Sequence, residues 1–243
     1  MSILITKPAS EIIYPSSDGE PLGETEIHFF VIFSLVETLS AWFSKNPMIH
    51  VAGDLMLYYE EGNPYKFVSP DVQVTFGIPK LPKRTVYLVW KEGKSPDFVI
   101  EVSSKSTSRN DLGGKLELYR DVLHVQEYFI FDPLEEYLDP SFVGYTLVEG
   151  EYQLIKAVDG RLPSKVMGLH LQRDGQQLRI YDPVGKKYLL SASEVRQAQD
   201  ELEARLQQAQ QASAQAEQAR KQAEDREERL RQEIEALRRQ LPN

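Results

Sequence analysis

The stretch PDFVIEVSS, residues 96–104, decides the fold, because it combines a strand pattern with an acid in an apolar setting. Its β-branched residues favour a strand, and Pro96 marks the strand entrance. Glu101 interrupts the apolar run. A carboxylate inside an apolar strand is costly unless a cation or hydrogen-bond donors satisfy it. The stretch therefore predicts a buried strand that carries a functional glutamate.

Helix and strand patterns lie on both sides of this strand. Helical spacing of apolar residues predicts a helix over residues 24–43, and a second helix opens at Asn110 or Asp111 and runs to about Leu123. Strands are expected at residues 49–59, 71–76, 86–90, 98–103 and 127–131, with further short strands between residues 142 and 190. This order predicts an α/β fold, in which helices flank a mixed β-sheet.

The acids near this strand are candidates for a shared metal ion. Asp97 and Glu101 share one strand face, but four residues separate them by roughly 13 Å, too far for one ion. Asp71 follows Pro70 on a different strand, so it can lie beside Glu101 if the two strands are neighbours. We therefore expect Asp71 and Glu101 to form the metal-binding pair, and Asp97 to fix the strand entrance.

A lysine on the following helix completes the expected chemistry. Two convergent carboxylates suit Mg²⁺ or Mn²⁺, which prefer oxygen ligands and retain waters. Lys115 could add positive charge toward a phosphoryl transition state if its helix packs over the strand end. The preceding loop offers candidate phosphate contacts at Ser106, Thr107, Ser108 and Arg109.

Taken together, these motifs resemble the Uma-type endonuclease family over roughly residues 20–190. The resemblance rests on PDFVIEVSS, on VSPDV at residues 68–72, on VQEYF at residues 125–129, and on Asp111, Lys115, Tyr119 and Asp132-Pro133. That family is similar in fold to the PD-(D/E)xK nucleases. The resemblance implies a restriction-endonuclease-like fold and a metal-dependent phosphodiesterase that acts on DNA.

Carried over by position, the resemblance makes Asp71 the first acid and Glu101 the second. The lysine usually found two residues after the glutamate is replaced by Ser103, which points to Lys115 on the helix, with Lys105 as the substitute. The accessory candidates are the following: Glu24 as a further acid from the N-terminal helix, Asp97, and Tyr119, for which core packing is the alternative. His28, four residues after Glu24, is expected to be a structural histidine.

The composition divides the chain into three parts. Residues 1–23 are rich in Pro and Ser and predict an extended arm, and residues 24–192 form the expected nuclease domain. Residues 193–243 contain no Gly and no aromatic residue, and predict a long helix. Its heptad seam supports a coiled coil, with a solvated helix as the alternative. The seam consists of Leu202, Ala209, Ala216, Ala223, Leu230 and Leu237, and of Leu206, Ser213, Arg220, Glu227, Ile234 and Leu241.

Charge and composition restrict the partners. The net charge of −9 repels nucleic acid at long range, so any DNA contact must be local, through a metal or a small basic patch. The chain has no cysteine, no signal peptide pattern and no apolar run long enough to span a bilayer, which favours a cytoplasmic protein without a membrane partner. The C-terminal helical tail suggests a homodimer.

Two further alternatives stay open. RNA or branched DNA could be the substrate in place of ordinary duplex DNA. The alternative function is a catalytically silent scaffold that is assembled through the coiled coil.

Overall fold

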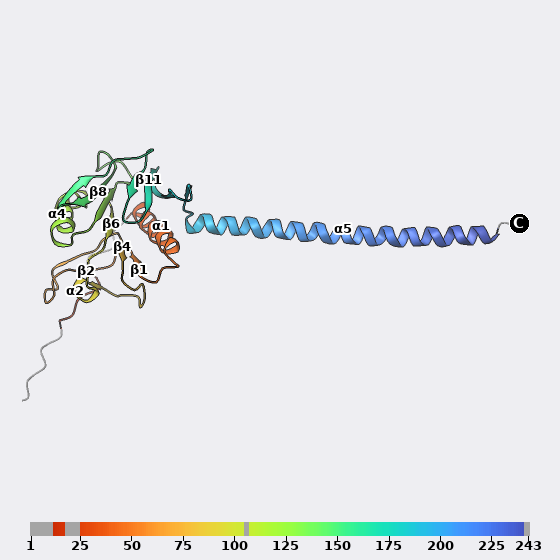
Figure 1. Ribbon diagram of the computed structural model, residues 1–243, viewed down its shortest axis with the longest axis horizontal. Helices are drawn as coiled ribbons and strands as arrows, with labels where there is room; N and C mark the ends of the chain where they lie inside the picture. Colours follow the sequence, from red (N-terminus) through yellow and green to blue (C-terminus); the bar gives the residue numbers. More distant parts are fainter. Residues whose placement is uncertain (1–11, 18–24, 105–106, 241–243) are drawn as a thin grey trace, which may run out of the picture. The chain divides into compact units, whose positions relative to one another are not determined.

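A computed structural model describes residues 12–17, 25–104 and 107–240. The chain divides into two units, Met1–Ser191 and Ala192–Asn243. The first holds the sheets and the cores, and the second is one long helix (Figure 1).

A mixed six-stranded sheet forms the centre of the first unit. Its order is β1 (Ile49–Ala52), β4 (Val72–Phe76), β6 (Phe98–Val102), β7 (Glu127–Phe131), β8 (Phe142–Val148) and β9 (Glu151–Leu154). β6 and β7 run parallel, whereas the other neighbours in this sheet are antiparallel. All five residues of β6 and of β7 are buried, as the apolar run at residues 98–102 predicted. The predicted α/β class with a mixed sheet is confirmed.

Helix α1 (Glu26–Trp42) packs on one face of this sheet. Thr25 caps its N-terminus, since the Thr25 hydroxyl accepts the backbone N–H of His28 at 3.2 Å. Val31, Leu35 and Leu39 of the helix join the core on this face with alternate residues of β4 and β6. A second, four-stranded sheet closes the same core, formed by β10 (Leu162–Ser164), β11 (Leu169–Asp174), β12 (Gln177–Asp182) and β13 (Lys187–Tyr188).

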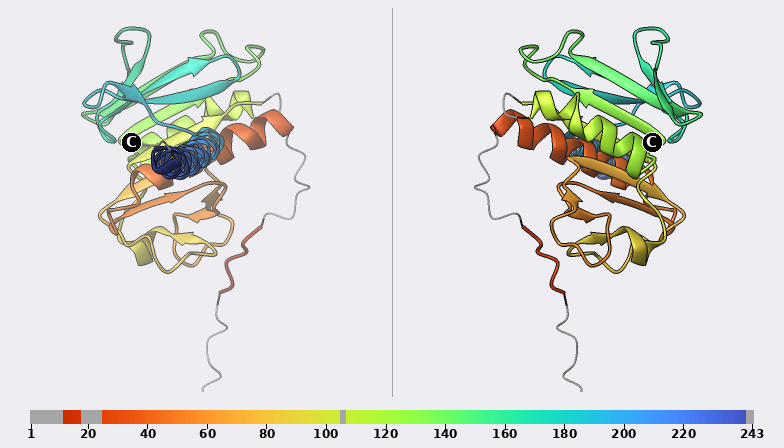
Figure 2. Two further views of the ribbon diagram at one scale, coloured as in Figure 1. Left: turned by 90° about the vertical axis from the view of Figure 1, so that its right-hand side faces the viewer. Right: turned by 90° about the vertical axis from the view of Figure 1, so that its left-hand side faces the viewer.

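The other face is covered by short helices and a small sheet (Figure 2). The helical segments are α3 (Ser108–Asp111), α4 (Gly114–Glu117) and the π-helical turn η1 (Leu118–Val122). The small sheet contains β3 (Phe67–Val68), β2 (Leu57–Tyr58) and β5 (Tyr87–Leu88), and α2 (Val89–Glu92) follows β5. Tyr119 and Leu123 pack here against Val99 and Tyr128 of the central sheet.

Three predicted elements are shorter than expected. The helix at residues 110–123 is broken at Gly113, whose φ of −121° and ψ of −97° are not helical. The strand at residues 49–59 is divided, because Asp54 turns the chain with a φ of 47°. Gly53 permits this turn, since an added Cβ would come within 3.0 Å of the backbone oxygen of Asp71. The strand expected at residues 86–90 gives way to α2 after two residues.

Helix α5 (Ala192–Gln240) makes up the second unit and has 49 residues. Every side chain from residue 195 to residue 236 is exposed in the single chain. Across the described part of the chain, no helix combines the length and the apolar character needed to cross a membrane.

Candidate active site

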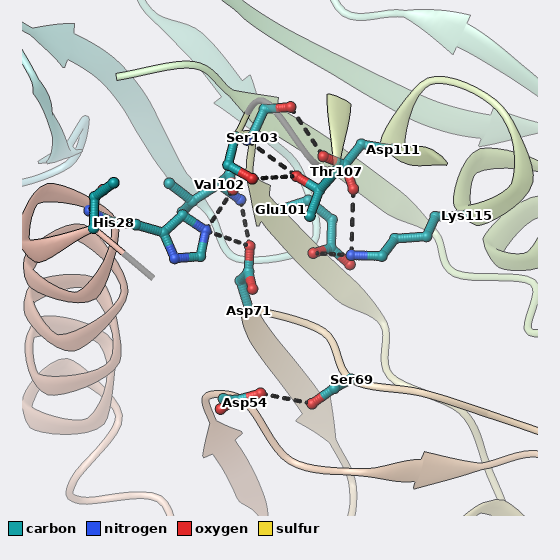
Figure 3. Close-up of polar contacts among 12 residues, drawn as sticks. His28, Asp54, Ser69, Asp71, Glu101, Val102, Ser103, Thr107, Asp111 and Lys115 are labelled. Atoms are coloured by element: carbon teal, nitrogen blue, oxygen red, sulfur yellow. Dashed lines mark hydrogen bonds and ion pairs between the residues drawn. The ribbon is translucent and has the colours of Figure 1, made fainter. Parts of the chain in front are cut away.

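Polar side chains converge where β4 begins and β6 ends. Asp71 directly precedes β4, and Glu101 is the fourth residue of β6. His28 reaches this point from α1, and Lys115 reaches it from α4 on the opposite side (Figure 3). Four segments far apart in the sequence therefore supply one cluster.

The register of the sheet brings the two predicted acids together. Val72 pairs with Ile100 in the antiparallel ladder of β4 and β6, so the next position along places Asp71 opposite Glu101. Residues opposed in this way have Cβ atoms about 5 Å apart. Asp71 is anchored there, because its Oδ2 accepts the backbone N–H of Val102 at 2.6 Å. The neighbouring strands required by the sequence argument are therefore present.

Glu101 is completely buried, with a side-chain exposure of 0%, and both of its oxygens have partners. Oε2 accepts from the Lys115 ammonium at 2.8 Å, and Oε1 accepts from the Tyr119 hydroxyl at 2.5 Å. Burial, opposed by Lys115 but reinforced by Asp71 and Asp111, raises the pKa of Glu101 to about 8. The glutamate therefore takes up or releases its proton close to neutral pH.

Asp111 belongs to the same cluster, although it was not among the predicted site residues. Its Oδ1 lies 3.2 Å from Lys115 Nζ, and its Oδ2 accepts from the Ser103 hydroxyl at 2.9 Å. Burial lowers the pKa of Lys115, but Glu101, Asp111 and Asp71 outweigh it and hold that pKa above its usual value. Ser103 therefore orients Asp111 through its hydroxyl, and Asp111 in turn holds the ammonium of Lys115. The four-residue spacing from Asp111 to Lys115 within the helix predicted at residues 110–123 was the available sequence signal.

His28 also lies at the site, which its expected structural role did not indicate. Its Nε2–H donates to the carbonyl oxygen of Val102 at 2.6 Å, and the same nitrogen lies 3.5 Å from Asp71 Oδ2. The hydrogen bond to Val102 is the structural role that was expected of His28. Its distance from Asp71 also places the imidazole beside the candidate metal site. No spacing in the sequence relates His28 to Asp71, since 43 positions separate them.

Tyr119 satisfies both expectations, because it is buried in the core and its hydroxyl contacts Glu101. Asp97 does not join this cluster, and it lies instead at the strand entrance, which was the other expectation for it. Asp97 lies just before β6, at its other end. Its Oδ2 accepts the backbone N–H of Phe76 at 2.7 Å and forms an ion pair with the Lys94 ammonium at 2.8 Å. A strand cannot bring both of its ends to one ion.

Several candidates fall on residues that the structure does not describe. Glu24, Lys105 and Ser106 lie outside the described residues, and so does the side chain of Arg109. Of the predicted phosphate loop, Thr107 and Ser108 are described: the Thr107 hydroxyl accepts the backbone N–H of Ser104, and the backbone N–H of Ser108 donates to the Ser104 carbonyl, each at 3.0 Å.

The cluster fits a hard divalent cation. Asp71, Glu101 and Asp111 in their ionised forms carry three negative charges against the single positive charge of Lys115, and a buried excess of charge requires a counter-ion or a proton. Each carboxylate oxygen has two lone pairs, so Glu101 can keep its hydrogen bonds and still bind an ion. No set of three or more His, Cys, Asp or Glu side chains forms a metal cage among the described residues. A site with two carboxylates suits Mg²⁺ or Mn²⁺, which retain several waters.

A comparison with models of protein families identifies the family of this chain. Residues 9–215 match the Uma2 family, described as "Putative restriction endonuclease". The chain belongs to the Uma2 family. This confirms the family expected from the motifs, and with it the restriction-endonuclease-like fold. The match extends from before α1 into α5, and thus includes all the residues of the cluster.

A solved structure is also similar to this chain. It is a crystal structure of a "putative nuclease belonging to DUF820" from Anabaena variabilis. The two chains are 16% identical, and the alignment covers 61% of this Uma2 protein and 79% of the other chain with a TM-score of 0.45. A comparison with curated proteins gives no match.

Proposed function

We propose that this Uma2 protein is a metal-dependent endonuclease that hydrolyses phosphodiester bonds in DNA. One observation supports this above all: Asp71 and Glu101 are opposed on neighbouring strands, with the ammonium of Lys115 held 2.8 Å from Glu101. Two acids and a lysine at one point are the groups that phosphodiester hydrolysis requires: a metal site and a fixed positive charge. Membership in the Uma2 family supports the same reaction class.

In this proposal Asp71 and Glu101 hold Mg²⁺ or Mn²⁺. The bound ion supplies a coordinated water of lowered pKa and neutralises charge on the phosphoryl group. Asp71 is the more accessible ligand, with 13% of its side chain exposed, while Glu101 lies beneath it. Glu101 would hold the ion as a carboxylate, so it would release its proton to solvent when the ion binds. His28 Nε2 lies 3.5 Å from Asp71 Oδ2, at the edge of the proposed metal site.

Lys115 stabilises the negative charge that develops on the phosphorus oxygens. Its position is fixed in advance by Glu101 and by Asp111, and Ser103 orients Asp111. A donor that is already oriented pays no reorganisation cost during the reaction. DNA contact must be local in a chain with a net charge of −9, and the metal together with Lys115 provides such a contact.

The test is nicking of supercoiled plasmid in the presence of Mn²⁺. The parent protein is compared with an Asp71→Asn, Glu101→Gln double variant, and with Glu117→Gln as a matched control. Glu117 lies two residues after Lys115 on α4 but is exposed, so its loss leaves the site intact. Circular dichroism checks that each variant is folded. Cutting by the parent and by the control, but not by the double variant, is the expected result; equal cutting by all three would refute the site.

A binding or scaffolding module is the second candidate function. The observation that favours it is Ser103 at the usual lysine position, together with a 49-residue helix that is exposed from residue 195 to residue 236 and offers a surface for assembly. Mn²⁺ affinity discriminates between the two functions, because a scaffold has no need of a metal at Asp71 and Glu101. A parent protein that neither cuts plasmid nor binds Mn²⁺ would support the scaffold.

We also propose that the chain forms a homodimer through α5.

A further inference from the structure

Helix α5 presents a periodic apolar seam whose leucine and isoleucine side chains are exposed among the described residues. Leu202, Leu206, Leu230 and Ile234 are 68%, 57%, 50% and 52% exposed. They occupy the two seam positions of a heptad repeat, near the two ends of the helix. Between them the seam carries Ala209, Ser213, Ala216, Arg220, Ala223 and Glu227. A helix with such a seam is stabilised by pairing with another helix.

A parallel pair of α5 helices is disfavoured by the charges in this seam. In a parallel homodimer each seam residue faces its own copy, so Arg220 would face Arg220 and Glu227 would face Glu227. At the edge of the same interface, Arg226 of one helix would lie beside Arg231 of the other. Like charges in a partly desolvated seam repel strongly.

An antiparallel pair centred at residue 218 removes these conflicts. In that register Leu202 faces Ile234 of the second copy, and Leu206 faces Leu230 of the second copy. The apolar ends of the two helices therefore cover each other. Arg220 and Glu227 face alanines, because their opposed positions are Ala216 and Ala209. No seam position then faces a like charge.

Charged residues beside the seam favour the same register. In an antiparallel pair, positions on one edge of the seam face the same edge of the partner. Arg205 then lies opposite Glu233 of the second copy, and Glu203 lies opposite Arg231 of the second copy. Charged pairs at these flanking positions set the orientation of coiled coils. A like-charge pair that remains, Glu217 with its own copy, lies next to Arg220 of both helices.

We infer that α5 binds α5 of a second copy of this chain as an antiparallel coiled coil centred at residue 218. Each folded unit is joined to the N-terminal end of its own α5, at residue 192. With a rise of 1.5 Å per residue, the two copies of residue 192 lie about 80 Å apart. The two folded units are therefore attached to the paired helices at opposite ends of the pair.

The absence of cysteine makes the orientation directly testable. We would prepare Leu206→Cys and Leu230→Cys variants of the full chain and oxidise each alone, and then together after mixing and exchange. In the antiparallel register, residue 206 faces residue 230 of the second copy, but two copies of residue 206 lie about 36 Å apart. A disulfide requires Cα atoms within roughly 7 Å. Gln218→Cys, on the outer face of the helix, controls for random collision.

The expected result is a covalent dimer from the mixture and no covalent dimer from either variant alone. Covalent dimers from both single variants would show a parallel pair and overturn the inference. Absence of cross-linking in the mixture, with a monomeric mass of the parent by light scattering, would also overturn it. Helix content measured by circular dichroism shows whether each variant keeps α5. None of these readouts depends on nuclease activity, so they are independent of the proposed function.

Discussion

The two ends of strand β6 carry the same chemistry in different surroundings. At one end Asp97 accepts from Lys94 at 2.8 Å and from the Phe76 amide at 2.7 Å. At the other end Glu101 accepts from Lys115 at 2.8 Å and from the Tyr119 hydroxyl at 2.5 Å. The side chains of the first ion pair are 37% and 21% exposed, whereas those of the second are 15% and 0% exposed.

This difference in burial distinguishes the structural ion pair of Asp97 from the candidate active site around Glu101. Lys94 lies three residues before Asp97, so one loop supplies both partners and water screens their charges. Lys115 reaches Glu101 from another element, within a cluster that holds two further acids. Water screens the charges of this second cluster much less than those of the first.

The largest effect is expected on plasmid nicking. Lys115→Met should lower the initial rate about 100- to 1000-fold, the usual loss when one preorganised transition-state contact is removed. Lys94→Met should change the rate less than a few-fold, because Lys94 lies at the far end of β6. Rates with Mn²⁺ at pH 8 give the measurement. Equal losses in the two variants would place the reaction elsewhere.

The same pair of variants should differ in stability. Lys115→Met leaves Glu101 and Asp111 buried without their cation, which should cost about 3 kcal/mol of unfolding free energy at pH 8. Lys94→Met should cost about 1 kcal/mol or less, since that pair is partly exposed. Urea unfolding measures both values. The cost of Lys115→Met should shrink at pH 5.5, where Glu101 takes up a proton; a cost independent of pH would contradict the buried charge.

Metal affinity should depend on pH through Glu101. Its pKa in the folded chain is raised to about 8, mainly by burial, so below that pH a proton competes with the metal. Mn²⁺ affinity, measured by calorimetry without DNA, should rise up to tenfold per pH unit and level off above about pH 8. Glu101→Gln should bind weakly at every pH, and Asp97→Asn should keep the profile of the parent. A flat profile in the parent would refute the assignment.

The raised pKa of Glu101 also determines in which direction the stability of the metal-free protein changes with pH. The folded chain binds the Glu101 proton more tightly than the unfolded chain does. The contribution of Glu101 to stability is therefore complete below its ordinary pKa of 4.5, and it is lost as the pH rises to about 8. Melting of the parent against Glu101→Gln from pH 5 to pH 9 measures this loss, which should be smaller when Mn²⁺ is present.

The smallest effect is expected for the Tyr119 hydroxyl. Tyr119→Phe removes a buried donor to Glu101 and should cost about 1–2 kcal/mol of stability. Tyr152→Phe is a matched control, because the Tyr152 hydroxyl donates to the Val125 carbonyl at 2.9 Å away from the site. Only Tyr119→Phe should also shift the pH profile of Mn²⁺ binding. An identical shift in both variants would make Tyr119 a core residue without influence on Glu101.

The sequence by itself determined the features that depend on nearby residues. The apolar run at residues 98–102 predicted a buried strand, and the cost of a carboxylate in such a run singled out Glu101. Composition also predicted the long C-terminal helix, which is observed as α5. Period and burial are local properties of a chain, so a pattern of residues reports them reliably. The geometry of one strand was enough to separate Asp97 from Glu101.

Only the tertiary structure decided which distant residues meet. The neighbouring order of β4 and β6 places Asp71 opposite Glu101, and the packing of α1 brings His28 to Asp71. Lys115 reaches the buried Glu101 from α4, although the helix predicted there is broken at Gly113. These contacts follow from strand order and helix packing, which are set by the burial of whole faces. No single window of sequence contains that information, so the cluster emerges only when the faces are packed.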